Sequence, residues 1–236
     1  MKKYELTEET KVIGGKTLFR IRALRSFGGI KAGDLGGFIE NERNLSHGGN
    51  AWVGGNAEVY GNAQVVGYAQ VGGNAQVNGY AQVGGNAWVE DNAQVGGNAR
   101  VSGDAWVEDN ARVDGDAWVG GYARVNGDAQ VVGDARVDGN AQVGGDAWVG
   151  GNARVGGDGL INSNNDYLCE QGLGSRNRSA SFFKCKDGHI HVLCGCFSGN
   201  LDEFENKVKE EHGNSKYSKE YLGFIEVVKT HFEVRQ

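Results

Sequence analysis

Proline is absent from this chain and cysteine is scarce. The 236 residues include no proline, four cysteines and 41 glycines. Without proline and without a strict three-residue glycine period, a collagen-like triple helix is excluded. The cysteines, Cys169, Cys185, Cys194 and Cys196, all lie in the C-terminal third and are too few for a disulfide framework. We therefore expect free thiols in a reducing compartment.

Long apolar runs and basic regions are also missing. No apolar run approaches the roughly eighteen residues that a membrane helix needs, and no signal-peptide pattern follows Met1. The net charge is −6, and it divides into +3 for residues 1–50, −8 for residues 51–158 and −1 for residues 159–236. We therefore expect a cytoplasmic protein without membrane contact, which does not bind nucleic acid through a basic surface.

The chain has instead a six-residue repeat. From Ala51 to Asp158 eighteen successive hexads follow the pattern Ala-x-Val-x-Gly-Asn/Asp, with alanine and valine in every hexad and the Gly-Asn or Gly-Asp pair in most. A helical array is excluded, because glycine in every turn would cost about 1 kcal/mol each time. The alternation in Ala-x-Val indicates a short strand with alanine and valine on one side, and the Gly-Asn or Gly-Asp pair indicates a turn. Each hexad is predicted to form one strand and one corner.

Three hexads are predicted to make one coil. A three-residue strand cannot bury a core alone, so the hexads must coil and stack. The hexamer WVEDNA occurs at residues 88–93 and again at 106–111, eighteen residues later, which matches a coil of three hexads. Segments such as VGGNAQV (71–77) and VGGNAR (95–100) closely resemble the hexapeptide repeat of left-handed parallel β-helices.

The resemblance implies a left-handed parallel β-helix of triangular coils, in which an aliphatic and a small residue point inward. The regular hexads fill six coils, and residues 33–50 add an imperfect seventh. In this imperfect coil we expect Leu35, Ile39 and Leu45 to point inward.

The flanking segments predict two end units. Residues 11–24 are typical of a hairpin that turns at Gly14-Gly15, and we expect it to seal the N-terminal end of the β-helix. Residues 179–196 predict a second hairpin around Asp187-Gly188.

Two helices are predicted to follow the second hairpin. The first is capped by Asn200 and ended by Gly213, and the second is amphipathic. The predicted organisation is mainly β, with three parts: an N-terminal β cap over 1–32, the β-helix over 33–158, and a small C-terminal α+β domain over 159–236.

Specific contacts must come from the outward positions, because alanine and valine fill the interior. All five tryptophans occupy the x position and the hexads contain no lysine. Tryptophan and arginine are enriched in protein interfaces, whereas lysine is depleted. Trp88 and Trp106 are predicted to be vertical neighbours, with Trp52 two coils away. The candidate interface consists of Trp52, Trp88, Arg100, Trp106, Trp118, Arg124, Arg136 and Trp148.

The alternative interpretation of the same columns is structural. Stacked glutamines could share amide hydrogen bonds, and tryptophan beside arginine gains a cation–π contact of about 0.5–1 kcal/mol. The columns Arg100–Trp118–Arg136 and Trp106–Arg124 fit this interpretation.

An acidic edge accompanies these columns. Glu90 and Asp91 are predicted to stack under Glu108 and Asp109. A cation could bridge them, but no spaced ligand loop of the calcium-binding kind is present, and solvated corners that keep the repeat soluble are favoured. We expect neither a metal nor a cofactor.

A zinc site in the C-terminal domain is suggested by His189, His191, Cys194 and Cys196, which lie close in sequence. We expect strand alternation to place both histidines on the face opposite Cys185 and Cys194, and no CxxC pair exists. The sequence therefore disfavours zinc. No base can be assigned that would make Cys194 a nucleophile.

An enzymatic function is the first alternative. Many left-handed β-helix proteins are acyltransferases, and the resemblance implies a histidine and projecting loops at a trimer interface. The eighteen hexads contain no histidine and no inserted loop. The nearest candidate is His47, which we expect at an inward, valine-equivalent position with a structural role.

A protein-binding scaffold is our leading hypothesis. Residues 27–46 resemble the opening of hexapeptide-repeat proteins from bacterial and phage genomes, and residues 186–232 resemble a terminal domain of phage and prophage repeat proteins. We expect a non-enzymatic, phage- or prophage-encoded homo-oligomer that binds a host protein and inhibits a defence or regulatory factor. The alternatives are an acyltransferase-like enzyme and an acidic mimic of nucleic acid, which the five arginines of the hexads weaken.

Overall fold

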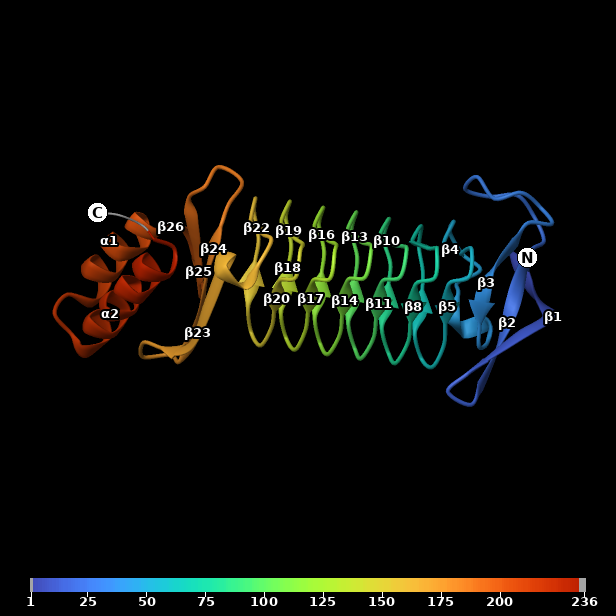
Figure 1. Cartoon of the computed structure of the whole chain (residues 1–236), viewed down its shortest axis with the longest axis horizontal. Helices are drawn as coiled ribbons and strands as arrows, with labels where there is room; N and C mark the ends of the chain where they lie inside the picture. Colours follow the sequence, from blue (N-terminus) through green and yellow to red (C-terminus); the bar gives the residue numbers. More distant parts are fainter. Residues whose placement is uncertain (1, 234–236) are drawn as a thin grey trace.

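The molecule is a rod with a different unit at each end. A computed structural model describes residues 2–233 of the chain. Figure 1 shows stacked coils in the middle, antiparallel strands at the N-terminal end, and a sheet with two helices at the C-terminal end. The predicted fold class is confirmed: the chain is mainly β, with a parallel solenoid of about seven coils.

The coils form three parallel faces. The first face contains β22 (Leu160–Ile161), β19 (Gln142–Val143), β16 (Arg124–Val125), β13 (Trp106–Val107), β10 (Trp88–Val89), β7 (Gln70–Val71) and β4 (Trp52–Val53). The second face contains β21 (Arg154–Val155), β18 (Arg136–Val137), β15 (Trp118–Val119), β12 (Arg100–Val101), β9 (Gln82–Val83) and β6 (Gln64–Val65). The third face contains β3 (Leu35–Ile39), β5 (Glu58–Val59), β8 (Gln76–Val77), β11 (Gln94–Val95), β14 (Arg112–Val113), β17 (Gln130–Val131) and β20 (Trp148–Val149). Its sheet continues beyond β3 with two antiparallel strands of the N-terminal unit, β2 (Lys16–Ala23) and β1 (Tyr4–Ile13).

The register of these faces follows the eighteen-residue period. Trp88 pairs with Trp106, and Trp106 pairs with Arg124. The alanine and valine of every hexad are fully or almost fully buried, and they form one continuous core along the rod. Most of these strands end at a corner whose glycine adopts a left-handed backbone, as Gly97 does with a φ of 58°.

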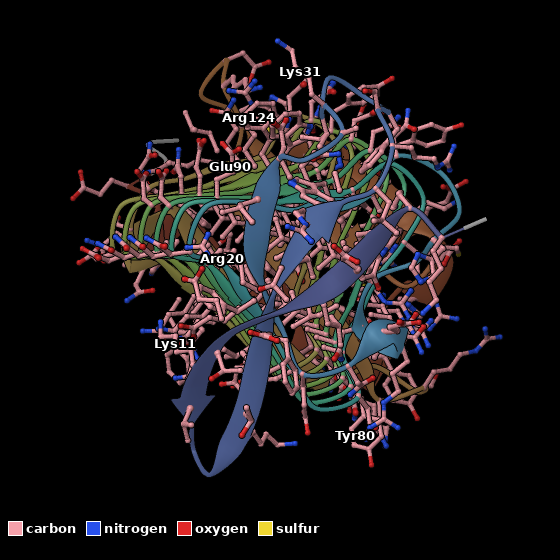
Figure 2. The ribbon with its side chains drawn as sticks, turned by 90° about the vertical axis from the view of Figure 1, so that its right-hand side faces the viewer. Lys11, Arg20, Lys31, Tyr80, Glu90 and Arg124 are labelled. Atoms are coloured by element: carbon pink, nitrogen blue, oxygen red, sulfur yellow. The ribbon has the colours of Figure 1, made fainter. Side chains whose placement is uncertain are left out.

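The N-terminal hairpin is confirmed, although it begins earlier than predicted. β1 and β2 pair antiparallel, and β2 pairs antiparallel with β3. Figure 2 looks along the rod and shows these strands crossing in front of the coils. The buried Lys3 ammonium donates to the backbone oxygen of Ala51 at 2.7 Å and lies 5.0 Å from the ring centre of Phe27. The hairpin and its flanking residues therefore cover the end of the core.

The imperfect coil is twenty residues long, not eighteen. Ile39 pairs with Val59 and Leu45 with Val65, and both Ile39 and Leu45 are fully buried as predicted. Leu35 is 56% exposed, so its predicted inward position is wrong. Leu35 is the first residue of β3 and pairs with Arg22 of the N-terminal hairpin, whereas Phe38 and Ile39 are the residues of β3 that pair with the next coil. The longer coil also contains the short 3-10 helix η1 (Glu42–Asn44).

The C-terminal unit combines a four-stranded antiparallel sheet with two helices. Its elements are η2 (Asn164–Asp166), β23 (Tyr167–Leu173), β24 (Arg178–Lys184), β25 (Ile190–Cys194), β26 (Phe197–Asn200), α1 (Leu201–His212) and α2 (Lys216–His231). The predicted hairpin, the capping box at Asn200 and the helix end at Gly213 are all confirmed. Phe182 of the sheet packs with Phe204, Tyr221 and Ile225 of the helices. Within residues 2–233, no helix has the length and apolarity that a membrane span requires.

Candidate interaction face

Two tryptophans and one arginine form a continuous strip on the first face. The rings of Trp88 and Trp106 stack with their centres 5.4 Å apart and their planes at 12°. The Arg124 guanidinium lies 5.6 Å from the ring centre of Trp106, which completes a cation–π contact. Trp88 is 37% exposed, Trp106 is half-buried and Arg124 is exposed. We call Trp88, Trp106 and Arg124 the tryptophan–arginine strip.

Trp52 does not belong to an exposed surface. Only 4% of this residue is exposed, and its ring meets Phe27 edge-on with the centres 5.5 Å apart. An added methyl group on Gly36 would lie 2.7 Å from the Trp52 ring, so β3 also packs closely against it. The predicted interface role of Trp52 is therefore wrong, because the N-terminal cap covers this residue.

The remaining candidate residues lie on other faces. Arg100, Trp118 and Arg136 are consecutive partners on the second face. The Trp118 indole N–H donates to Ser102 Oγ at 3.0 Å, and among the described residues Trp118 makes no cation–π contact with either arginine. Trp148, 59% exposed, lies on the third face. The predicted set is thus divided among three faces.

An acidic corner borders the strip. It consists of Glu90 and Asp91 in one coil and Glu108 and Asp109 in the next. Asp91 and Asp109 take the corner position at which the other coils have glycine, with φ values of 57° and 60°. The Asp91 carboxylate accepts a hydrogen bond from the Asp109 N–H at 3.3 Å, and the Asp109 carboxylate accepts one from the Gly127 N–H at 2.9 Å. These bonds between coils partly offset the cost of the left-handed backbone.

The acidic corner concentrates negative charge. Burial raises the pKa of Glu90, and the neighbouring charges of Asp91 and Glu108 raise it further. Figure 2 places Glu90 and Arg124 on the same side of the rod. The strip and the corner therefore present aromatic, cationic and anionic groups side by side.

Ladders of side-chain amide hydrogen bonds run along the corners and not along the flat faces. Asn74 donates to Asn92 at 3.2 Å, Asn92 to Asn110 at 3.3 Å, and Asn110 to Asp128 at 3.0 Å. No glutamine of the described residues donates to a stacked glutamine; Gln70, for instance, donates to backbone oxygens. The prediction of glutamine ladders is therefore wrong, because amides on the faces reach the backbone or acids first.

Sequence reasoning overlooked three exposed tyrosines at corners, Tyr68, Tyr80 and Tyr122. Each occupies the position that is usually asparagine or aspartate, a departure that was visible in the repeat. Tyr80 projects from the rod in Figure 2.

His47 lies against the N-terminal cap and not inside the core. Its ring stacks on Tyr4 with the centres 4.4 Å apart, Nδ1 accepts from the Lys3 N–H at 3.2 Å, and Nε2 lies 3.5 Å from a Glu42 carboxylate oxygen. The side chain is 29% exposed, so the predicted inward position is wrong. The twenty-residue coil explains the error, because it puts Leu45 at the valine-equivalent position. These contacts agree with the structural role predicted for His47.

Comparison with known proteins supports the architecture of the coils. The family model described as a YdcK β-solenoid repeat matches residues 93–108, a segment within the regular hexads. The chain is a parallel β-solenoid protein. None of the curated proteins compared with it matches.

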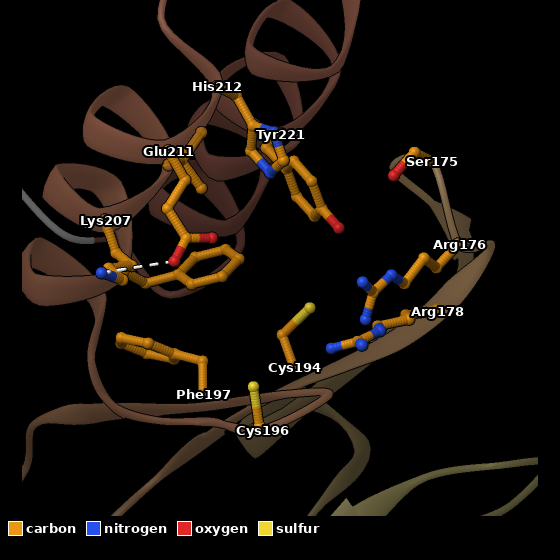
Figure 3. Close-up of a pocket in the computed structure, with 12 residues that line it drawn as sticks. Ser175, Arg176, Arg178, Cys194, Cys196, Phe197, Lys207, Glu211, His212 and Tyr221 are labelled. Atoms are coloured by element: carbon orange, nitrogen blue, oxygen red, sulfur yellow. Dashed lines mark ion pairs between the residues drawn. The ribbon is translucent and has the colours of Figure 1, made fainter.

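The C-terminal unit of this solenoid contains a pocket of about 510 Å³ between its sheet and its helices. Figure 3 shows Arg176, Arg178 and Cys194 on the sheet side, facing His212 and Tyr221 on the helix side. Burial raises the pKa of the Cys194 thiol, which opposes thiolate formation. The Cys194 thiol in this pocket is therefore harder to ionise than a solvated thiol.

A second pocket, of about 630 Å³, lies beside the hairpin of β24 and β25. Cys185, His189 and His191 all line it, although the histidines were predicted to face away from Cys185. That prediction is wrong because Cys185 is the cross-strand neighbour of His189: its N–H donates to the His189 oxygen at 2.9 Å. Directly opposed residues in an antiparallel pair share a face. Cys194, by contrast, lies on the opposite face as predicted and lines the first pocket.

Proposed function

We propose that this chain is a protein-binding scaffold whose contact surface is the tryptophan–arginine strip with the adjoining acidic corner. The observation that carries the proposal is the exposed Trp88 ring, held flat against Trp106 with Arg124 beyond it. Trp and Arg supply a large part of the binding energy in many protein interfaces. The parallel coils keep the strip ordered before binding, which reduces the entropy lost on association.

The chemistry of the strip indicates the kind of partner. Trp88 and Trp106 suit an apolar or aromatic patch, and the neighbouring carboxylates suit basic side chains at its border. We therefore propose a protein partner with an apolar patch flanked by lysine or arginine. In the finer form of the proposal, the chain is an accessory protein of phage or prophage origin that inhibits a host protein in the host cytoplasm. Two resemblances support that form. Residues 27–46 resemble hexapeptide-repeat proteins from bacterial and phage genomes, and residues 186–232 resemble a terminal domain of phage and prophage repeat proteins.

Photo-crosslinking tests this proposal. A photo-reactive phenylalanine derivative is introduced at position 88, and a matched control carries it at Gln130, which is exposed on the third face. Capture of one partner protein from host cells at position 88 but not at position 130 is expected. In the purified complex, Trp88→Ala should lower the affinity at least about tenfold.

Other outcomes are informative. Crosslinks between two copies of this chain at position 88 would assign the strip to self-association. Partner binding that persists at full affinity in a Trp88→Ala/Arg124→Ala variant would contradict the proposal. Displacement of the partner by DNA would favour nucleic-acid mimicry by the acidic corner.

A further inference from the structure

Cys185, His189 and His191 bring three metal-ligating side chains together at one end of the C-terminal hairpin. One ligand atom from each residue lies within 4.8 Å of the others. Nε2 of His189 and Nδ1 of His191 are 3.5 Å apart. Two nitrogens bound at about 2.1 Å to one tetrahedral zinc ion lie ~3.3–3.4 Å apart, so the observed separation fits a shared ion.

Hydrogen bonds to the far nitrogen of each ring orient the near nitrogens, Nε2 of His189 and Nδ1 of His191, toward each other. Nδ1 of His189 is hydrogen-bonded to the Asp187 carboxylate, and Nε2 of His191 lies 2.9 Å from Ser198 Oγ. A carboxylate can only accept, so Nδ1 of His189 carries the proton and Nε2 presents a lone pair. Metal-bound histidines are typically oriented in this way by a carboxylate or hydroxyl on the far nitrogen.

The surroundings of the cluster suit a cation with an accessible coordination position. The three residues line the pocket of about 630 Å³, whose wall also includes Asp158, Asp202 and Glu203. A thiol with two imidazoles selects a borderline-soft transition metal over calcium or magnesium. Three protein ligands leave one position of a tetrahedral zinc ion for water or a small donor from the pocket.

We propose that Cys185, His189 and His191 form a zinc-binding site, with Asp187 and Ser198 orienting the histidines. The site lies where the end unit meets the solenoid, because Cys185 pairs with Gly159 and packs against the solenoid core. Bound zinc therefore joins the two strands of the hairpin next to this junction. This proposal is independent of the tryptophan–arginine strip.

Titration of the full chain with metal tests the site. The protein, produced without a histidine tag and stripped with a chelator under a non-coordinating reductant, is titrated with Zn²⁺ by calorimetry and with Co²⁺ by absorption. One equivalent per chain and a thiolate-to-cobalt charge-transfer band are expected. Cys185→Ser should abolish the band, and His191→Asn should lower the zinc affinity at least about tenfold.

Matched variants distinguish zinc binding at this site from zinc binding by other thiols and imidazoles of the chain. Cys196→Ser and His212→Asn, both in the first pocket, should leave zinc affinity and the cobalt spectrum unchanged. Asp187→Asn changes an exposed turn residue and should weaken zinc binding about 10–100-fold without unfolding the chain, which circular dichroism verifies. A wild-type chain without the charge-transfer band, or a band that persists in Cys185→Ser, would overturn the proposal; the cluster would then be a hydrogen-bonded chain only.

Discussion

At the scale of single residues, the acidic corner is where the sequence departs from its own repeat. Asp91 and Asp109 adopt a backbone conformation that glycine provides without strain. Each aspartate gains a hydrogen bond to the next coil, but the four carboxylates also repel one another. The left-handed backbone and the charge repulsion both lower the stability of the fold. Such a cost is typical of residues that are retained for binding.

The pH dependence of the free energy of unfolding, compared between the wild-type chain and a Glu90 variant, tests this repulsion. Its pKa is raised in the folded chain, mainly by burial and then by Asp91 and Glu108, so the folded state binds this proton more readily than the unfolded state. Protonation of Glu90 therefore stabilises the folded state as the pH falls through the folded pKa. At neutral pH the carboxylate is ionised and this stabilisation is absent. We expect Glu90→Gln to raise the free energy of unfolding by about 0.5 kcal/mol at pH 7.

The gain should become smaller near pH 4, where the carboxyl is mostly protonated in both states because its unfolded-state pKa is about 4.3. Urea unfolding at several pH values measures it. Glu8→Gln, at an exposed position on β1, is the control and should change little at either pH. A Glu90→Gln gain that is the same at pH 4 and pH 7 would show that charge repulsion is not its cause.

At the scale of the elements, each coil depends on a corner where backbones lie against each other. At Gly97 an added methyl group would lie 2.7 Å from the Gly115 nitrogen and 2.8 Å from its oxygen. Such distances leave no space for a side chain at Gly97 unless the neighbouring coil shifts. The corner glycines therefore serve both the turn and the stacking of successive coils.

A pair of glycine substitutions separates these two roles. Gly14, in the turn between β1 and β2, has a φ of 54°, close to that of Gly97, but a methyl group there would have no neighbour within 4 Å. Gly14→Ala should cost about 1 kcal/mol through backbone strain alone, whereas Gly97→Ala should cost more than about 2 kcal/mol because the next coil must also move. Thermal unfolding compares the two, and equal costs would exclude a stacking contribution.

At the scale of the whole molecule, the end units decide which outward residues remain accessible. Trp52 and Trp88 occupy the same column of the first face, separated by Gln70. The cap covers Trp52, whereas Trp88 stays accessible. The same cap also covers the open end of the core, which would otherwise be a template for end-to-end association.

Replacing individual tryptophans measures the contribution of the cap. Trp52→Ala should destabilise the chain by about 3–5 kcal/mol, since it leaves a cavity beneath Phe27 and β3. Trp148→Ala, at an exposed position, should cost about 1 kcal/mol or less. Chemical denaturation of both variants provides the comparison. Similar small losses would mean that the cap does not pack against Trp52 in solution.

The sequence by itself determined the coils, their register and the neighbours within each column. This was possible because a strict six-residue period repeats the same local geometry, so Trp88 must lie beside Trp106. The helix limits at Asn200 and Gly213 were equally local, since capping needs only adjacent residues.

Only the tertiary structure decided the burial of Trp52, the position of His47 and the shared face of Cys185 and His189. Each depends on contacts that the hexad period does not encode: the covering cap, a coil longer by two residues, and pairing across a hairpin. The local period fixed the geometry of the columns, whereas packing between distant segments decided which side chains stay accessible.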